Sequence, residues 1–459
     1  MNSNTLLQRV LPWAAAPVLA LVVVACSGNG DDDPTPPGLS SSPAASTYDS
    51  AVPVEWHELF YTRIKATGVN PPTASRIFGY AGVALYESIL PGMSDYQTLQ
   101  GQLNAFPTGT IPAPENAPYH WPTVANRALA VVGTSFLASS TTQINAKEQQ
   151  FLTQFEATQS ADVISRSVAY GEVVANAVLA WAATDGIGTQ GTCGSTFTPP
   201  VLPGVGGWTP ISPATGVGLL PCWGNLRTFA VDDTSECAPV GAPAFSTSTS
   251  SAWYAQALLV YNTTGDAGAA LSTDQAAIAN YWADGATQTG TPPGHWVAIA
   301  CQMSSELPLA LDRSAEAFAR VGIAVADAFT TCWKAKYVDY LMRPATYIRA
   351  NIDAAWDPLL GTPNFPTYIS GHSTQSGAAA TVLMDMLGPV AFTDTCHSRL
   401  NPELSFTDRS YASFAEAGAE AAVSRLYGGI HFAFDNVDGS DSGECVGNII
   451  NANVHFRRP

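Results

Sequence analysis

Positive charge is scarce in this sequence. Of its 459 residues only 19 are Lys or Arg, against 37 Asp or Glu, which gives a formal net charge of −18. A field of this sign repels nucleic acid and anionic membrane surfaces, so neither is an expected partner. Any site for an anion must therefore be built locally from a few of these cations.

Three other features are missing. No apolar stretch beyond the N-terminus approaches a membrane-spanning length, no cysteines have CxxC or Cys/His zinc spacing, and the alternation typical of β-strands is nearly absent. The chain is nevertheless 46% hydrophobic, which together with its length is enough for a large core. These absences favour a helical protein that is not embedded in a membrane.

The N-terminus has the pattern of an export signal. Arg9 precedes an apolar, proline-interrupted run over residues 10–25 that is too short for a comfortable membrane span. The run ends in Val-Val-Ala-Cys at Cys26, which resembles the bacterial lipobox. The resemblance implies cleavage of a signal peptide (1–25), lipidation of Cys26, and a lipid anchor at the periplasmic face of the outer membrane or at the cell surface. The alternative is an ordinary secretory signal followed by an incidental cysteine.

Residues 26–52 are rich in Ser, Pro, Gly and Asp, and we expect them to form a disordered tether before a folded domain at 53–459. Seven cysteines follow Cys26, and disulfides are the default in an exported protein. Cys222 with Cys237, and Cys396 with Cys445, are the candidate pairs. The odd number leaves at least one thiol free, and spacing alone does not fix the connectivity.

Helical periodicity dominates the rest of the chain and predicts an all-α fold of packed bundles. A loop-rich excursion over 185–250, rich in Gly, Pro, Thr and Ser, interrupts the helices. The predicted helices cover 53–66, 73–91, 123–138, 144–158, 161–183, 273–284, 296–306, 312–342, 372–387, 411–426 and 440–453.

The first chemically distinctive segment spans 333–344. Lys336 and Arg343 are seven residues apart, so a continuous helix would project both cations from one face. Pro344 is expected to stop that helix. Taken alone, two cations on one helix face are most often simply solvated.

The second segment is Ser370-Gly371-His372, directly before the apolar helix predicted at 372–387. Free backbone N–H groups and the helix dipole make such an N-terminus suitable for an anion. The simpler interpretation is that Ser370 caps the helix and His372 lies at the surface.

The third segment runs from Arg425 to Asp435. Gly428 and Gly429 allow the backbone to turn before His431, and Asp435 follows His431 by four residues. A carboxylate there would fix the tautomer of a ligating imidazole, although a buried His–Asp pair is often only structural.

Together the segments read Lys-x6-Arg-Pro, Ser-Gly-His and Ser-Arg-x5-His-x3-Asp. This order resembles the superfamily shared by vanadium-dependent haloperoxidases and type 2 phosphatidic-acid-phosphatase-like acid phosphatases, over roughly residues 330–440. Ile369 stands where that pattern usually has Pro. Trp333, Phe365 and the segments at 281–285 and 291–296 resemble the haloperoxidase branch and extend the likeness to a catalytic core at 270–455.

The resemblance implies two fused four-helix bundles of the vanadium chloroperoxidase and acid phosphatase type, with vanadate as cofactor. It implies hydrogen peroxide, a halide and an organic acceptor as reaction partners. His431 would coordinate vanadate with Asp435 behind it, and His372 would be the acid/base. The oxyanion would be held by Lys336, Arg343, Arg425, Ser370 and Gly371, with Asp284, Trp333 and Phe365 around them. Asp284 is expected to pair with Arg425, and His295 to be structural.

The same residues support a second chemistry. In a soluble acid phosphatase, His431 would be the nucleophile that forms a phosphohistidine, and His372 would protonate the leaving alcohol. A surface-anchored binding lipoprotein with a relic site is a third class. It is disfavoured because a protein without catalysis has no need to retain every motif residue.

Overall fold

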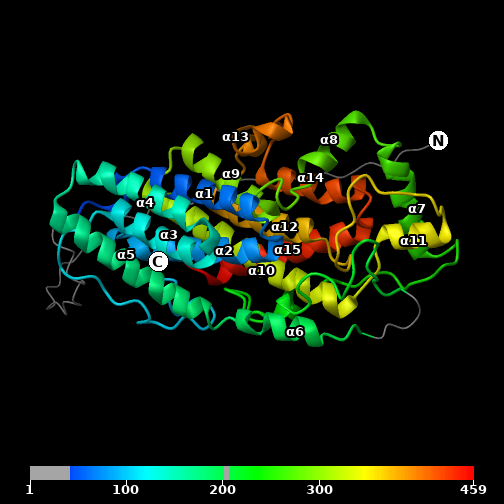
Figure 1. Ribbon diagram of the computed structural model, residues 1–459, viewed down its shortest axis with the longest axis horizontal. Helices are drawn as coiled ribbons and strands as arrows, with labels where there is room; N and C mark the ends of the chain where they lie inside the picture. The colour runs from blue at the N-terminus through cyan, green and yellow to red at the C-terminus, as the bar shows by residue number, and fades with distance from the viewer. Residues whose placement is uncertain (1–41, 201–205) are drawn as a thin grey trace, which may run out of the picture. The chain divides into compact units, whose positions relative to one another are not determined.

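The computed structural model describes residues 42–200 and 206–459, so the predictions for the signal peptide and Cys26 lie outside the described residues. The described part is almost entirely helical (Figure 1), as the all-α prediction required. Two short strands, β1 (Phe392–Asp394) and β2 (Arg409–Tyr411), pair antiparallel. The helices are α1 (Ala51–Thr67), α2 (Pro71–Ile89), α3 (Trp121–Phe136), α4 (Thr141–Glu156), α5 (Ala161–Ala182), α6 (Gln190–Thr196), α7 (Ala252–Thr264), α8 (Thr273–Tyr281), α9 (Thr291–Glu306), α10 (Leu311–Asp339), α11 (Pro344–Asn351), α12 (Gly371–Leu387), α13 (Cys396–Leu400), α14 (Phe414–Tyr427) and α15 (Ala433–Asn453).

The long helix α10 joins two groups of packed helices. It packs extensively against α2 and also contacts α1 and α9, while α3 and α5 cover α2. It also packs against α12 and, less extensively, against α15, and α14 completes this second group. Because α10 is buried along nearly its whole length, it belongs to the core of both groups and fixes them together.

The end of α10 differs from the prediction. The helix stops at Asp339, where Tyr340 adopts a left-handed conformation (φ 50°) and its N–H bonds to the Lys336 carbonyl. Pro344 does not terminate this helix; it opens α11, where proline is favoured because the first N–H has no helical partner. Lys336 therefore lies on α10 and Arg343 caps α11, so the expected shared helix face is wrong.

The helices that carry the other motif residues begin at different kinds of residue: α12 and α14 have serine N-caps, whereas the N-cap of α15 is Phe432. Ser370 caps α12 by accepting a hydrogen bond from the Ser373 N–H, as the sequence predicted. The last helix, α15, begins at Ala433 rather than at residue 440, and Asp435 lies in its first turn. Between α14 and α15 the chain turns at Gly429, whose φ is +74°, which leaves His431 just outside the helix.

The excursion at 185–250 is mostly irregular, but a buried carboxylate holds it on α10. Asp327 accepts hydrogen bonds from the N–H groups of Phe229 (2.6 Å), Ala230 (2.8 Å) and Val231 (3.1 Å). After it comes α7, which the sequence analysis missed. Its buried residues Trp253, Ala257 and Val260 pack into a separate small core, and further apolar residues on its other faces obscure the helical pattern.

Both candidate disulfide pairs are wrong. The bonds join Cys193 to Cys222 and Cys237 to Cys445, with sequence separations of 29 and 208. Cys396 is a buried free thiol, as are Cys301 and Cys332. The second bond ties the loop before α7 to the last helix, a proximity that only the tertiary fold creates.

One helix departs from the expectation about apolar runs. By length and mean hydropathy, α5 is long and apolar enough to cross a membrane. It packs against α2, α3 and α4, and Glu172 on it forms an ion pair with Arg127 (2.8 Å). The helix therefore packs on the bundle along one side, and 39% of its most apolar stretch is buried.

The folded part also begins earlier than residue 53. Ala45 is fully buried, and Leu311 N–H donates to the carbonyl of Tyr48 (2.9 Å). The Trp121 indole donates to the carbonyl of Pro43 (2.9 Å). Residues 42–52 are therefore part of the folded domain, and the predicted tether is shorter at this end.

Candidate functional site

Lys336 anchors the floor of the site from α10. Its side chain is fully buried, and Nζ donates to the carbonyls of Pro366 (3.0 Å), Thr367 (2.8 Å) and Ile369. Burial lowers the pKa of Lys336. The ammonium therefore shapes the 366–369 loop that leads into α12, in addition to supplying positive charge.

Arg343 is fully buried and only partly satisfied. Its Nε donates to the Phe365 carbonyl (2.9 Å), and Nη1 lies 2.9 Å from the Ile430 carbonyl and 3.0 Å from His431 Nε2. Its Nη2 has no hydrogen-bond partner. A buried guanidinium N–H without an acceptor is costly, so this group is set up for an anion.

Arg425 lies in the last turn of α14. Its Nη1 donates to the Trp282 carbonyl (2.9 Å), while its buried Nε has no partner. Burial lowers the pKa of Arg425 to about 10, which leaves it charged at neutral pH, and Asp284 opposes this effect.

His431 presents one nitrogen to these cations. Its Nδ1 lies 2.9 Å from Asp435 Oδ2, an acceptor that also takes the Phe432 N–H (3.0 Å) and the Thr367 hydroxyl. Burial raises the pKa of Asp435 to about 7, against the opposing effects of Thr367, Lys336 and Arg343. Because Oδ2 already accepts from two other donors, it accepts from Nδ1–H as well, and the lone pair of Nε2 accepts from Arg343 Nη1. Burial, and then Arg343 and Lys336, lower the pKa of His431 well below its usual range. The ring is thus neutral, the form that ligates a metal.

His372 lies one residue into α12, and its Nε2 also has no partner. The Trp282 carbonyl accepts a hydrogen bond from its ring, which must come from Nδ1–H and leaves Nε2 as an acceptor. Burial and Arg425 lower the pKa of His372 well below its usual range. A cavity of about 560 Å³ reaches this point, lined by Asp284, Phe365, His372 and Arg425 together with residues from 283–289 and 359–363.

Phe365 and Trp333 form an aromatic wall. Their rings are 5.1 Å apart, and Phe365 lies 5.2 Å from Lys336 Nζ and 4.9 Å from the Arg343 guanidinium. The Trp333 indole donates to the Leu219 carbonyl (3.1 Å), which ties the wall to the excursion. Cations on aromatic faces are stabilised where water is excluded.

Asp284 does not form the ion pair with Arg425 that was expected. Its Oδ2 is 2.9 Å from Nδ1 of His295, and its buried Oδ1 has no partner. The imidazole of His295 was available to it because α8 and α9 bring the two residues together. The sequence analysis also gave no role to Thr367, Trp282 or Asp394. Each acts through a contact that no local spacing encodes.

The site fits an oxyanion. Among the described residues, Arg343 Nη2 and Arg425 Nε are buried donors without a partner, and Arg343 Nη1 lies 3.0 Å from His431 Nε2. Two guanidinium groups, one ammonium and a helix N-terminus are groups that would hold the oxygens of an oxyanion. The structure brings Arg343, Arg425 and His431 into one buried site, and the roles predicted for the individual motif residues remain predictions.

Comparisons with known proteins concern the family and the fold of the chain. Residues 316–457 match the family model described as the VCPO second helical-bundle domain. The crystal structure of the first bacterial vanadium-dependent iodoperoxidase is similar, with a TM-score of 0.80 and 30% identity over 90% of this chain and 98% of that chain. No curated protein matches the sequence.

Two further structures share the fold. The apo-type bacterial vanadium-dependent chloroperoxidase has a TM-score of 0.61 at 15% identity, covering 82% of this chain and 92% of its own. The holo-type has a TM-score of 0.59 at 15% identity, covering 92% and 96%. Fold and site thus define an all-helical enzyme of the peroxidase type with an oxyanion site. The chain belongs to the vanadium-dependent haloperoxidase family.

Proposed function

We propose that the chain binds vanadate at His431 Nε2 and uses hydrogen peroxide to oxidise a halide, with iodide as the first halide to test. The observation that carries this is the set of unpartnered buried donors on Arg343 and Arg425 beside the lone pair of His431. Iodide is chosen because the similar structure at 30% identity is an iodoperoxidase.

Each residue has a role in this proposal. Lys336, Arg343 and Arg425 neutralise the oxyanion, and Ser370 and Gly371 donate hydrogen bonds at the start of α12. Bound vanadate supplies Lewis-acid activation of peroxide without a change in the oxidation state of the metal.

His372 moves the proton. Its neutral ring has Nε2 free, so it accepts a proton from hydrogen peroxide that enters the cavity. The aromatic wall of Trp333 and Phe365 limits water around the oxyanion and strengthens its contacts with the cations. The oxidised halide then reacts with an organic acceptor.

The test uses purified protein with and without orthovanadate, assayed for peroxide-dependent oxidation of iodide and bromide. His431→Ala is expected to abolish vanadate binding. His372→Ala is expected to retain binding and to lose about a hundredfold or more in turnover. His455→Ala, at an exposed position, is the control and should behave as the unaltered protein.

A parallel assay of aryl-phosphate hydrolysis without vanadate separates the phosphatase chemistry. Hydrolysis that vanadate inhibits, with no oxidation of any halide, would contradict the proposal. Full halide turnover in His431→Ala or His372→Ala would contradict the assigned roles.

We also propose that Cys26 carries a lipid and anchors the enzyme to a membrane on the exported side. The support is the Val-Val-Ala-Cys sequence after the apolar run of residues 10–25. Mass spectrometry of the mature N-terminus and membrane fractionation of Cys26→Ser test it. A mature protein that begins elsewhere, or a variant that stays in the membrane fraction, would contradict it.

A further inference from the structure

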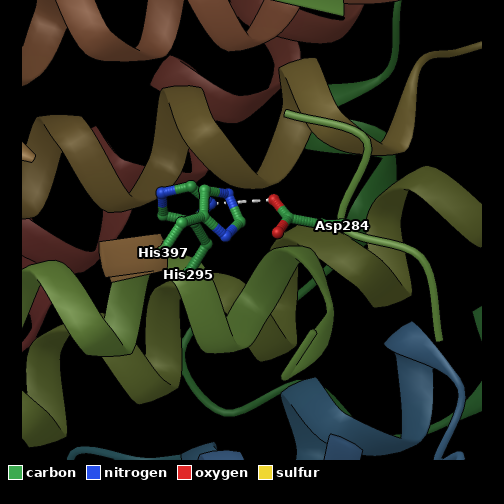
Figure 2. A group of neighbouring side chains, drawn as sticks. All are labelled: Asp284, His295 and His397. Atoms are coloured by element: carbon green, nitrogen blue, oxygen red, sulfur yellow. Dashed lines mark hydrogen bonds and ion pairs between the residues drawn. The ribbon is translucent and has the colours of Figure 1, made fainter. Parts of the chain in front are cut away.

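Behind the cavity lies a buried chain of three charged side chains. His295 on α9 is fully buried, with Nδ1 2.9 Å from Asp284 Oδ2 and Nε2 2.7 Å from Asp394 Oδ2. Figure 2 shows the Asp284 carboxylate directed at the His295 imidazole, with His397 beside it. Because both carboxylates accept, both nitrogens of His295 must carry protons and the ring is an imidazolium.

The surroundings agree with a charged ring. The indole of Trp282 stacks on His295 with 4.4 Å between ring centroids. Burial alone would lower the pKa of His295, but Cys396, Asp284 and Asp394 raise it well above its usual range. In turn, burial alone would raise the pKa of Asp284, but His295, with His397 and His372, lowers it to about 2. Asp284 is thus a carboxylate at neutral pH.

Asp284, His295 and His397 are close enough to hold a metal ion, but their nitrogens are already engaged. Both nitrogens of His295 face carboxylates. His397 Nε2 lies 2.8 Å from the Tyr281 carbonyl and its Nδ1 3.2 Å from the Asn401 amide nitrogen. No ring nitrogen has a lone pair available for coordination, so the group holds a proton rather than a metal cation.

One oxygen of the chain remains unused. Asp284 Oδ1 is buried without a donor, although Asp284 lines the cavity that His372 and Arg425 also line. His372 Nε2 is likewise an acceptor without a donor. The cavity therefore has two unsatisfied acceptors in its wall, and an unsatisfied buried acceptor favours a ligand with O–H groups.

Hydrogen peroxide is such a ligand, because it is small, neutral and carries two O–H donors. We propose that Asp284 Oδ1 is the second acceptor for hydrogen peroxide beside His372, and that His295 and Asp394 are positioning residues that hold Asp284 for this purpose. The negative charge of Asp284 also disfavours a halide at the same spot, which keeps that part of the cavity for peroxide. This inference rests on the proposed function.

Asparagine at position 284 turns the acceptor that faces the cavity into a donor. The His295 Nδ1–H still needs an acceptor, so the amide oxygen takes the place of Oδ2 and the NH2 group takes the place of Oδ1. Asp284→Asn is therefore expected to raise the KM for peroxide about tenfold or more, with the KM for iodide within about twofold and vanadate affinity within about threefold. Glu87→Gln is the matched control, since Glu87 is a buried carboxylate on α2 bonded to Thr98 and Leu99, and its KM for peroxide should not change.

His295→Gln and Asp394→Asn are expected to raise the KM for peroxide in the same direction. The double variant Asp284→Asn/His295→Gln should be no worse than Asp284→Asn, because His295 acts through Asp284. A readout independent of turnover is the 15N spectrum of histidine-labelled protein without vanadate. There, the His295 signals should show both nitrogens protonated from pH 5 to pH 9.

Four outcomes would overturn the inference. These are an unchanged KM for peroxide in Asp284→Asn, equal increases for peroxide and iodide, an unprotonated nitrogen on His295, or stoichiometric metal bound by the group. Each leaves the proposed function standing if the unaltered protein oxidises iodide with vanadate. Absence of vanadate-dependent oxidation in the unaltered protein would instead remove the proposed function, and this inference with it.

Discussion

Replacing Asp435 with asparagine tests how the protein prepares His431 as a ligand. Asp435 is fully buried, and its Oδ2 accepts from His431 Nδ1, from the Phe432 N–H and from the Thr367 hydroxyl. An asparagine oxygen in the same place still accepts all three bonds, so the ring orientation and tautomer are retained. What is lost, at a pH above the Asp435 pKa that burial raises to about 7, is the negative charge that raises the basicity of Nε2.

The magnitude follows from that single change. Removing the carboxylate partner of a ligating histidine typically lowers affinity about 10- to 100-fold, which corresponds to about 1.4–2.7 kcal/mol. The NH2 group also takes the position of Oδ1, which has no partner among the described residues, so a buried donor is left unsatisfied. We therefore expect vanadate affinity to fall by about one to two orders of magnitude, with the fold intact.

The assay is equilibrium titration of the protein with orthovanadate, followed by calorimetry, for the unaltered protein and two variants. Asp438→Asn is the matched control, because Asp438 lies one turn further along α15 and bonds to the Tyr368 hydroxyl (2.7 Å), not to His431. Its affinity should stay within about twofold. Equal affinities for Asp435→Asn and the unaltered protein would refute the argument that the carboxylate activates His431.

Three further predictions concern stability. Cys237→Ser should lower the free energy of unfolding in urea by about 5 kcal/mol and Cys193→Ser by about 4 kcal/mol, because the Cys237–Cys445 bond closes the longer loop. In reductant, each variant should be as stable as the unaltered protein. Asp327→Ala should cost at least about 3 kcal/mol in thermal unfolding, since three buried N–H groups lose their acceptor. The lowered pKa of Asp284, about 2 against 3.8, contributes about 2 kcal/mol that is present above pH 4 and lost as the pH falls towards 2. Acid unfolding of His295→Gln should lack that loss, and an identical acid limb in both proteins would contradict it.

The long helices and the oxyanion residues were predictable from the sequence, for a physical reason. Helices of this length have an apolar pattern that repeats over many turns, and Ser370 before an apolar run is a local capping signal. The order and internal spacing of the three motif segments are visible in the sequence. They therefore identified Lys336, Arg343, Ser370, His372, Arg425 and His431 before the arrangement of these residues was known. The comparisons confirm the family that these segments indicated.

What failed depended on contacts between distant segments. Pro344 fits equally well after one helix or at the start of the next, and only the packing of α11 decides. The partner of Cys237 is 208 residues away. Asp284 was expected to pair with Arg425, and His295 was not considered as its partner. In the structure α8 and α9 bring Asp284 against His295, which Asp394 contacts from the other side.

The helices beside the two histidines of the site, α12 and α15, pack closely against each other. On α15, Gly439, Gly443 and Gly447 recur every four residues and face α12; a Cβ at Gly443 would lie 2.0 Å from the Thr374 carbonyl oxygen. Larger side chains would push α12 away from α15, and with it Ser370, whose N–H donates to the Asp435 carbonyl (3.0 Å). That bond joins the first turn of one helix, which carries His372, to the first turn of the other, which orients His431. The distance between His372 and His431 is therefore set by backbone contact between α12 and α15 along these three glycines. Such contact deforms less than side-chain or loop contacts do, so a site with many buried charges can keep its geometry.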